Sequence, residues 1–257
     1  MIALRPAVVF FALLLFWQAV VWSTAVPPFI LPGPLPVALT VVEDFGLLMH
    51  HAGVTLVEML LGFVLGVLFG GLAALTLVSC RPIRPWLLPL LVASQAIPVF
   101  ALAPLLVLWL GYGLASKVAM ASLIIFFPVT ASFYDGLRRT EPGWLDLATT
   151  MGASPLSILR HLRIPAALPA LASGLRVAAA VVPIGAVVGE WVGASAGLGY
   201  LMLHANGRMQ VDVMFAALFC LAVMALALYF LLDWALRRAI PWQPDSLLTS
   251  STNALKG

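Results

Sequence analysis

Charged residues are scarce in this chain. Only 9% of its 257 residues are Asp, Glu, Lys or Arg, whereas 63% are hydrophobic, and the mean hydropathy is +1.10. A soluble globular domain carries about a quarter charged residues, so this deficit excludes that class and predicts an integral membrane protein. The long apolar runs predict that it crosses the bilayer as α-helices. The small net charge of +3 gives no indication of nucleic-acid binding.

Residues that could hold a metal ion are also few. The chain has two cysteines and four histidines, and none of them shows the spacing of a ligand set. Two of the histidines are adjacent and therefore point in different directions on a helix, and the others are isolated. We expect structural thiols and no metal site. The residues concerned are Cys80, Cys220, His50, His51, His161 and His204.

Phosphate-binding and catalytic motifs are missing as well. The sequence contains no G-x-x-x-x-G-K-[ST], and Lys117 follows Ser116 rather than a glycine. The chain therefore cannot bind ATP through a P-loop of its own, and it offers no Ser/His/Asp set. We expect neither an enzyme active site nor a cofactor bound by this chain.

Six apolar stretches are long enough to cross a bilayer. They cover residues 6–26, 55–79, 85–110, 117–134, 169–188 and 213–232. No clear cleavage site follows the first, so we interpret it as a retained helix rather than a signal peptide. Residues 27–51 are too polar and too rich in Pro and Gly to cross, and we expect an outer loop there with a short amphipathic helix near 36–49. The predicted fold is all-α, a single transmembrane domain over residues 1–257.

The basic residues predict the orientation of these spans. With six spans and both termini inside, eleven Lys and Arg residues fall on the inner side and only Lys117 and Arg208 on the outer, which accounts for all 13. This distribution satisfies the positive-inside rule and puts the loop at residues 140–165 in the cytoplasm. The inner residues are Arg5, Arg81, Arg84, Arg138, Arg139, Arg160, Arg163, Arg176, Arg237, Arg238 and Lys256.

One face of the second span is lined with glycine. Gly62, Gly66 and Gly70 recur every four residues, a doubled GxxxG that lets another helix approach closely. Packing within the bundle is the first interpretation, and a subunit interface is the alternative.

Polar residues inside or next to the apolar stretches mark a possible translocation path. Intramembrane carboxylates are costly, so Glu58 is a candidate, as is Glu190, which follows the fifth span within reach of the membrane. Ser94, Gln95 and Pro98 in the three-proline third span are the other candidates. A broken helix at membrane depth is tolerated where it lines a cavity or is buried. The alternatives are a Glu58 that snorkels to the outer interface, a hydrated interfacial Glu190 and a kinked packing helix with a satisfied glutamine.

The longest mixed-polarity run, residues 144–165, predicts two short helices joined by a sharp corner. The first would cover residues 143–151, and Gly152 would take the left-handed conformation that ends it. Ser154 would then cap a second helix with Pro155 at its first position, running to residue 162. Pro165 would mark the next bend.

The spacing in this run resembles a known family motif. Asp146-Leu147-Ala148, then Gly152, then Leu162-Arg163-Ile164-Pro165 is similar to the EAA loop of ABC importer permeases, EAA-x3-G-x9-I-x-L-P. The departures are Asp for Glu, Leu for the first Ala, and Leu and Ile for the hydrophobic pair before the proline. The resemblance extends over residues 55–232. The alternative is an ordinary amphipathic cytoplasmic loop.

The resemblance implies a coupling helix that sits in a groove of a partner ATPase. The implied contact residues are Asp146, Leu147, Ala148, Gly152, Ala153, Ser154, Leu162 and Pro165. It also implies a second permease copy, a soluble substrate-binding protein, surrounding lipid, and a location in the bacterial inner membrane. ATP and Mg would be used by the partner ATPase. The Gly-rich segment at residues 189–200 is similar to a stretch that helps to form the outer gate in the family.

Within the family the chain looks most like the nitrate/sulfonate/taurine branch, which includes permeases for the pyrimidine precursor of thiamine. Residues 126–139 favour the thiamine-precursor members, and the absence of a mid-span Lys or Arg does not favour an anion. We therefore expect an importer of hydroxymethylpyrimidine, with an aliphatic sulfonate, taurine or nitrate as the alternative. The rival class is an ion-coupled secondary transporter, whose ion site would need Glu58, Glu190 or Asp233.

Overall fold

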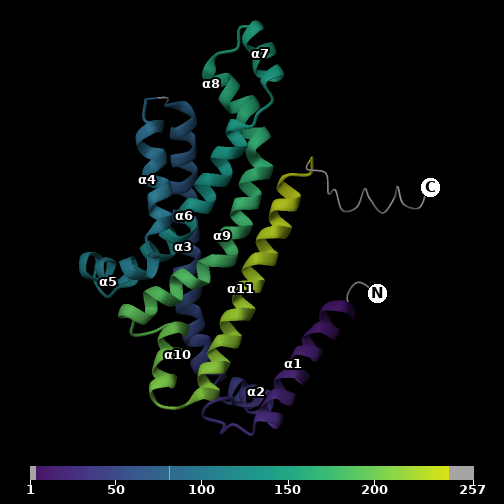
Figure 1. Cartoon of the computed structure of the whole chain (residues 1–257), viewed down its shortest axis with the longest axis vertical. Helices are drawn as coiled ribbons and strands as arrows, with labels where there is room; N and C mark the ends of the chain where they lie inside the picture. Colours follow the sequence, from purple (N-terminus) through teal and green to yellow (C-terminus); the bar gives the residue numbers. More distant parts are fainter. Residues whose placement is uncertain (1–3, 81, 243–257) are drawn as a thin grey trace, which may run out of the picture. The chain divides into compact units, whose positions relative to one another are not determined.

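The computed structural model describes residues 4–80 and 82–242, with side chains described for all of these except residues 4–7 and 94–96. Every regular element among the described residues is helical, which confirms the all-α prediction. In chain order (Figure 1) the elements are α1 (Leu4–Thr24), α2 (Pro34–Glu43), α3 (Phe45–Ser79), α4 (Arg84–Ala96), α5 (Val99–Leu110), α6 (Leu114–Arg138), α7 (Pro142–Thr150), α8 (Pro155–Ile158), the π-helical turn η1 (Leu159–Arg163), α9 (Ile164–Gly193), α10 (Leu198–Gly207) and α11 (Val211–Ala239).

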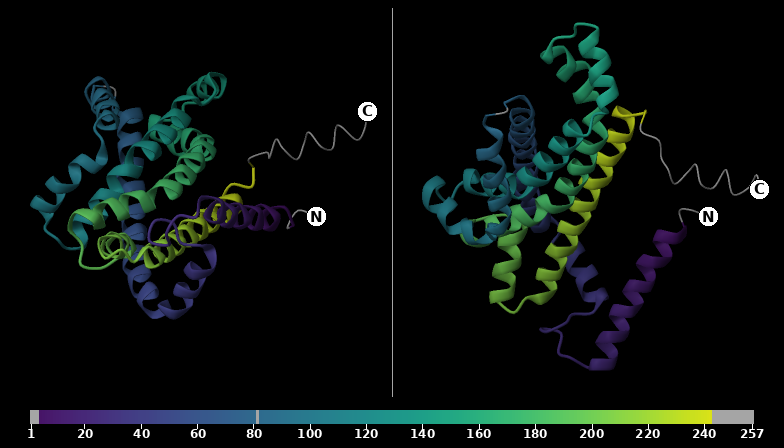
Figure 2. Two further views of the ribbon diagram at one scale, coloured as in Figure 1. Left: turned by 60° about the horizontal axis from the view of Figure 1, so that its bottom comes forward. Right: turned by 45° about the horizontal axis from the view of Figure 1, so that its top comes forward.

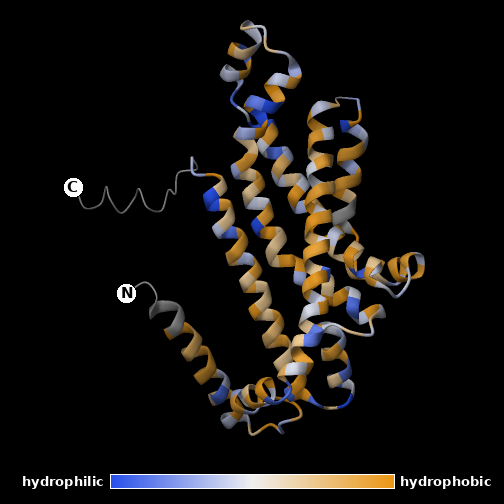
Figure 3. Ribbon diagram, turned by 180° about the vertical axis from the view of Figure 1, so that it is seen from behind, coloured by the Kyte–Doolittle hydropathy of each residue, from blue (hydrophilic) through white to orange (hydrophobic). Residues whose placement is uncertain are grey.

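Four helical stretches are long and apolar enough to cross a membrane. They are α3, α6, the run Pro155–Gly193 that contains α9, and α11. Shorter apolar helices cover Val8–Thr24, Pro34–Glu43, Arg84–Ala93 and Val99–Leu110. In Figure 3 the long helices are mainly orange, the colour of hydrophobic residues, and the base of the α7–α8 hairpin is blue.

The second predicted span begins ten residues earlier than expected. Residues 45–51 belong to α3 rather than to a separate loop helix, and α2 ends at Glu43. Asp44, with φ −97° and ψ 22°, is the only break between the two helices. At 35 residues α3 is about 52 Å long, which exceeds the roughly 30 Å hydrocarbon core of a bilayer.

The third predicted span is divided into two helices. α4 ends before Ile97, whose ψ of 119° is extended, and Pro98 precedes α5. Pro89 and Pro104 lie inside α4 and α5, so only one of the three prolines breaks the helix. The residue before a proline is driven away from helical ψ, which accounts for the break at Ile97.

The chain folds into two compact units. Unit 1 comprises Met1–Phe63, Pro98–Leu123 and Val182–Leu226, and unit 2 comprises Val64–Ile97, Ile124–Val181 and Ala227–Gly257. The helices α3, α6, α9 and α11 each contribute residues to both units. A single domain over residues 1–257 stays a prediction.

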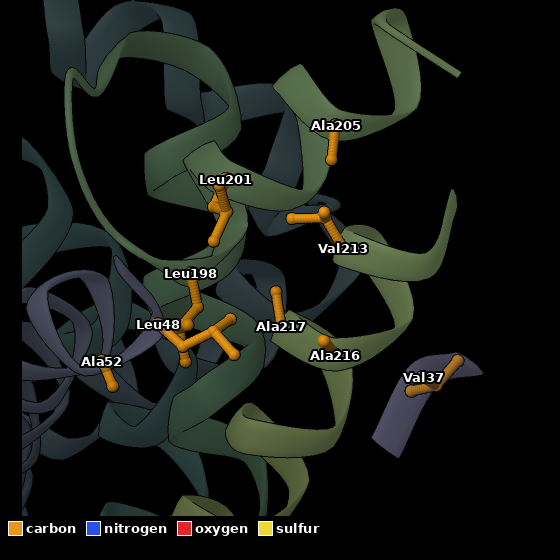
Figure 4. Close-up of a cluster of buried hydrophobic side chains, with 9 residues drawn as sticks. All are labelled: Val37, Leu48, Ala52, Leu198, Leu201, Ala205, Val213, Ala216 and Ala217. Carbon is orange, nitrogen blue, oxygen red and sulfur yellow. The ribbon is translucent and has the colours of Figure 1, made fainter. Parts of the chain in front are cut away.

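The core of unit 1 is built where α10 and the start of α11 meet α3 (Figures 1, 2 and 4). Leu48 of α3, Leu198 of α10 and Ala216 of α11 are fully buried there. Trp17 of α1 stacks on Phe215 with 5.6 Å between ring centroids and packs α1 against the same cluster. Small alanines on α11 allow the helices to approach closely.

The core of unit 2 brings α3, α4, α6 and α9 together. Its buried members include Leu77, Leu91, Phe133, Leu137 and Ala167. An ion pair also joins α9 to α11 in this unit. The Arg176 Nε donates to Asp233 Oδ1 at 2.7 Å, and the Arg237 Nε donates to Asp233 Oδ2 at 2.8 Å.

Candidate functional site

The α7–α8 hairpin turns at a corner that the sequence specifies locally. Gly152 adopts a left-handed φ of +79°. Its N–H donates to the Thr149 carbonyl at 3.0 Å, and the Ala153 N–H donates to the Ala148 carbonyl at 3.0 Å. This pair of bonds is the Schellman arrangement, which ends a helix with a residue that glycine suits best. The predicted left-handed corner is confirmed.

The second arm of the hairpin begins as expected. Ser154 is the N-cap of α8, and its Oγ accepts a hydrogen bond from the Ser157 N–H at 3.2 Å. Pro155 occupies the first helical position, where its missing N–H leaves no bond unmade.

The end of this arm differs from the prediction. The helix does not stop at Leu162 or bend away at Pro165 but passes through η1 directly into α9. In the π-helical turn the Ile164 N–H bonds back to the Leu159 carbonyl, five residues earlier. Such a widened turn accommodates a residue that has no backbone N–H to donate. Pro165 is therefore tolerated and the helix continues.

The hairpin presents much of its apolar surface outward. None of the residues of α7 and α8 is buried. Trp144, Leu147, Met151 and Leu156 are 56–78% exposed. Figure 1 shows the hairpin at the end of α6 and α9. Large apolar side chains exposed together indicate a surface for another protein. Of the predicted contact residues, Asp146, Leu147, Gly152 and Ser154 are exposed, and Ala148, Ala153, Leu162 and Pro165 are half-buried.

The glycine face of α3 is covered by α6 of the same chain. Gly62, Gly66 and Gly70 are all buried. A Cβ at Gly62 would meet the Cβ of Ala121, and a Cβ at Gly70 would lie 2.9 Å from the Phe126 carbonyl oxygen. At Gly62 and Gly70 the close approach is therefore made within the chain, which leaves no room there for a second subunit.

Two hydroxyl groups of α6 complete this contact. The Ser122 Oγ lies 2.7 Å from the Val118 carbonyl of its own helix and 3.1 Å from the Gly62 carbonyl, in unit 1. The Thr130 Oγ1 lies 2.7 Å from the Phe126 carbonyl and 3.2 Å from the Gly70 carbonyl, in unit 2, so each hydroxyl shares one proton between the two helices. Hydroxyls that reach a neighbouring helix in this way add to the packing of apolar helices.

A second glycine series was not singled out in the sequence. Gly185, Gly189 and Gly193 of α9 also recur every four residues. A Cβ at Gly185 would lie 2.6 Å from the Cα of Ala121, and one at Gly189 would lie 3.1 Å from the Cα of Lys117. The four-residue spacing that identified the α3 face would have identified this one.

The residues proposed for the translocation path fall in different surroundings. Ser94 and Gln95 lie in α4, but their side chains are outside the described residues. Pro98 is exposed at the break between α4 and α5. Glu58 and Glu190, in contrast, are only 3% and 1% exposed. Glu58 does not snorkel and Glu190 is not hydrated, because both are enclosed by other elements of unit 1.

Glu190 binds the beginning of α10. Its Oε1 accepts from the Thr55 hydroxyl at 2.7 Å, and its Oε2 accepts from the Tyr200 N–H at 3.1 Å. The Thr55 oxygen also accepts from the Leu198 N–H at 2.8 Å, and the His51 Nδ1 accepts from the Gly197 N–H at 3.0 Å. Three amides at the start of α10 are thus satisfied by side chains of α3 and α9.

Lys117 binds the opposite kind of helix end. Its ammonium donates to the carbonyls of Tyr112, Gly113 and Gly193, and so joins the loop before α6 to the C-terminus of α9. Lys117, which the charge distribution assigns to the outer side of the membrane, is 2% exposed. Glu58 is a close neighbour of both Glu190 and Lys117.

A helical pattern in the sequence could have revealed this cluster. His51, Thr55 and Glu58 are spaced i, i+4 and i+7, which places three polar side chains on one face of an apolar helix. Among the described residues no group of three or more His, Cys, Asp or Glu side chains could hold a metal ion.

Comparisons with known proteins identify the family of the chain. Residues 62–242 match the family described as binding-protein-dependent transport system inner membrane component. A probable ABC transporter permease protein of Haemophilus influenzae is 58% identical over 92% of this chain and 97% of its own length. The riboflavin transport system permease protein of Chloroflexus aurantiacus is 40% identical over 94% and 91%. The formylaminopyrimidine transport permease protein of Halalkalibacterium halodurans is 35% identical over 94% and 96%.

The fold is shared with a solved transporter. The MetNI methionine ABC transporter in an inward-facing conformation aligns with a TM-score of 0.64 and 21% identity, over 76% of this chain and 97% of the transporter chain. At that identity the likeness concerns the fold. The match over residues 62–242 and the relatives above 30% identity decide the family. The chain belongs to the binding-protein-dependent transport system inner membrane components, the multi-pass permeases of ABC importers.

Proposed function

We propose that this chain moves a small organic nutrient across the inner membrane, using ATP that a separate partner subunit hydrolyses. The observation that carries the proposal is the α7–α8 hairpin. It has the Gly152 corner of the EAA-like motif and exposes Trp144, Leu147, Met151 and Leu156. Exposed apolar side chains on a polar loop are suited to a groove in a protein partner. Asp146, Ala148 and Gly152 would contact the ATPase.

The continuity of the hairpin with α9 supplies a mechanical link. From Pro155 to Gly193 the chain is one helical run of 39 residues. A displacement of α8 by the ATPase would therefore reach α9 without a flexible joint. The Arg176–Asp233 ion pair, partly exposed at 25% and 18%, would carry part of this motion to α11. ATP binding would in this way shift the population between inward-open and outward-open states.

We propose six spans with both termini inside. α1, with 21 residues, is about 31 Å long and matches the bilayer. α4 and α5 have 13 and 12 residues, too short to cross separately, and would form one broken span. The eleven inner and two outer basic residues support this orientation.

The assembly would contain two permease copies, two ATPases and a soluble binding protein. The chain has no P-loop, so ATP and Mg would be held by the ATPase subunits alone. A homodimer is the simplest arrangement, and lipid would surround the two copies together.

The substrate we propose is a thiamine precursor, hydroxymethylpyrimidine. The relative at 35% identity is a permease for formylaminopyrimidine, also a substituted pyrimidine. The relative at 40% identity is a permease for riboflavin, which makes a larger nitrogen heterocycle the second candidate. An aliphatic sulfonate, taurine or nitrate remains the alternative from the sequence resemblance.

Purification of the tagged chain from native membranes in mild detergent tests the class. We expect a P-loop ATPase to co-purify in near-stoichiometric amount and to be identified by mass spectrometry. A chain that purifies alone and transports without ATP would overturn the proposal in favour of an ion-coupled secondary transporter.

Uptake into proteoliposomes loaded with ATP tests the substrate. The permease, its ATPase and the binding protein would be supplied with labelled hydroxymethylpyrimidine, riboflavin or taurine in parallel. We expect uptake of the pyrimidine that requires internal ATP. Uptake of taurine instead would contradict the substrate assignment but leave the transport class unchanged.

A further inference from the structure

Three ionisable side chains from three helices are buried together in unit 1. Glu58 of α3, Lys117 of α6 and Glu190 of α9 are each no more than 3% exposed. Removing an ion from water costs several kcal/mol unless bonds compensate for it. The role of these three groups therefore depends on the partners that they bind.

Glu190 and Lys117 bind helix ends of opposite polarity. Glu190 lies at the N-terminus of α10, the positive end of its dipole, and accepts from the Tyr200 N–H. Lys117 lies at the C-terminus of α9, the negative end, and donates to the Gly193 carbonyl. Each charge is placed where the backbone stabilises it, and each ties a short segment to a long helix.

The backbone before α10 is shaped around the Glu190 carboxylate. Gly197 has a φ of +117°, which side-chain-bearing residues rarely adopt. A Cβ on Gly197 would overlap the Glu190 carboxyl group, and one on Gly199 would lie 2.9 Å from its Oε2. The two glycines therefore allow the carboxylate to approach the amides directly.

We propose that Glu190 is a positioning residue that holds α10 against α3 and thereby determines where residues 194–207 lie during transport. Thr55 is the second member of this clamp, since its hydroxyl donates to Glu190 and accepts from the Leu198 N–H. His51 is the third and accepts from the Gly197 N–H. The role of Glu190 in transport rests on the proposed function, whereas the role of Glu190 in holding α10 does not.

Hydrogen exchange of the full chain in detergent tests the clamp without any transport assay. In Glu190→Ala the amides of residues 197–207 should exchange roughly 10- to 100-fold faster, because the buried acceptor of the Tyr200 N–H and of the Thr55 hydroxyl is lost. Residues 142–163 should be unchanged. Glu43→Gln, at an exposed site, is the matched control and should match wild type. Unchanged exchange of α10 in Glu190→Ala would overturn the proposal.

A second variant keeps the test decisive if Glu190→Ala does not fold. Thr55→Val preserves shape but removes the hydroxyl and with it the contacts to Glu190, to the Leu198 N–H and to the His51 carbonyl. It should also accelerate exchange of α10, and Thr55→Ser should restore the wild-type rate. Failure of Thr55→Ser to restore it would assign the effect to packing rather than to the clamp.

Comparison of the basal ATPase rate with the rate stimulated by the binding protein then tests the role of Glu190 in transport. In the assembled complex Glu190→Ala should retain the co-purifying ATPase and its basal rate but lose stimulation by the binding protein. Normal stimulation alongside faster exchange of α10 would refute the transport role. Absence of any ATPase from the wild-type preparation would instead refute the proposed function and leave the exchange result standing.

Discussion

Two neighbouring glycines in α3 allow helix packing to be separated from helix propensity. Gly70 faces α6, where an added Cβ would lie 2.9 Å from the Phe126 carbonyl oxygen and 3.0 Å from the Val129 Cγ1. Gly71 has no atom within 4 Å of the corresponding position. Replacing either by Ala gains about 0.5–1 kcal/mol of helix stability. Only Gly70→Ala also overpacks a contact, at a cost of about 1–3 kcal/mol.

The difference between the two variants isolates the contact because the propensity gain is common to both. Gly70→Ala should be less stable than Gly71→Ala by about 1–3 kcal/mol, measured by denaturant titration in mixed micelles. Adding Val129→Ala to Gly70→Ala should recover part of the loss, since the Val129 methyl is the softer of the two contacts and the Phe126 carbonyl cannot move freely. Equal stability of Gly70→Ala and Gly71→Ala would refute the close packing of α3 on α6.

Three further predictions concern unit 2. Gly152→Asp should fold but lose the partner ATPase. The variant should fold because a left-handed L residue costs only about 1–2 kcal/mol and no atom lies within 4 Å of the added Cβ. Normal uptake by Gly152→Asp would contradict the assignment. Gly152→Asn would separate backbone strain from side-chain bulk. Ser154→Ala should speed exchange of the Ser157 amide through loss of a cap of about 1 kcal/mol, and unchanged exchange would argue against the cap. Asp233→Asn should lower the melting temperature more than Asp135→Asn, whose ion pairs of 3.6 and 3.9 Å are more exposed. Equal melting temperatures would show that the Arg176–Asp233 pair contributes little to stability.

The hairpin corner was predictable because it depends on local backbone preferences. Gly152 adopts the left-handed conformation without the penalty that other residues meet, Ser154 is a preferred N-cap, and Pro155 suits the first helical position. The structure contains all three in these places. The end of the same hairpin was not predictable from Pro165. Whether a proline ends a helix or is tolerated within it depends on the geometry of the turn before it. Here that turn is the π-helical η1, which depends on how the chain packs.

The sequence by itself determined the all-α membrane class, the ends of the long helices to within ten residues, and the family motif. These follow from the apolar composition, the bilayer and short-range spacing, none of which requires knowledge of distant contacts. Only the tertiary structure decided which groups Glu190 and Lys117 bind and that Glu58 is buried beside them. Their partners lie on other helices, up to 135 residues away in the case of Thr55 and Glu190. A buried charge has a role only through such partners, so its function could not be derived from its position along the chain.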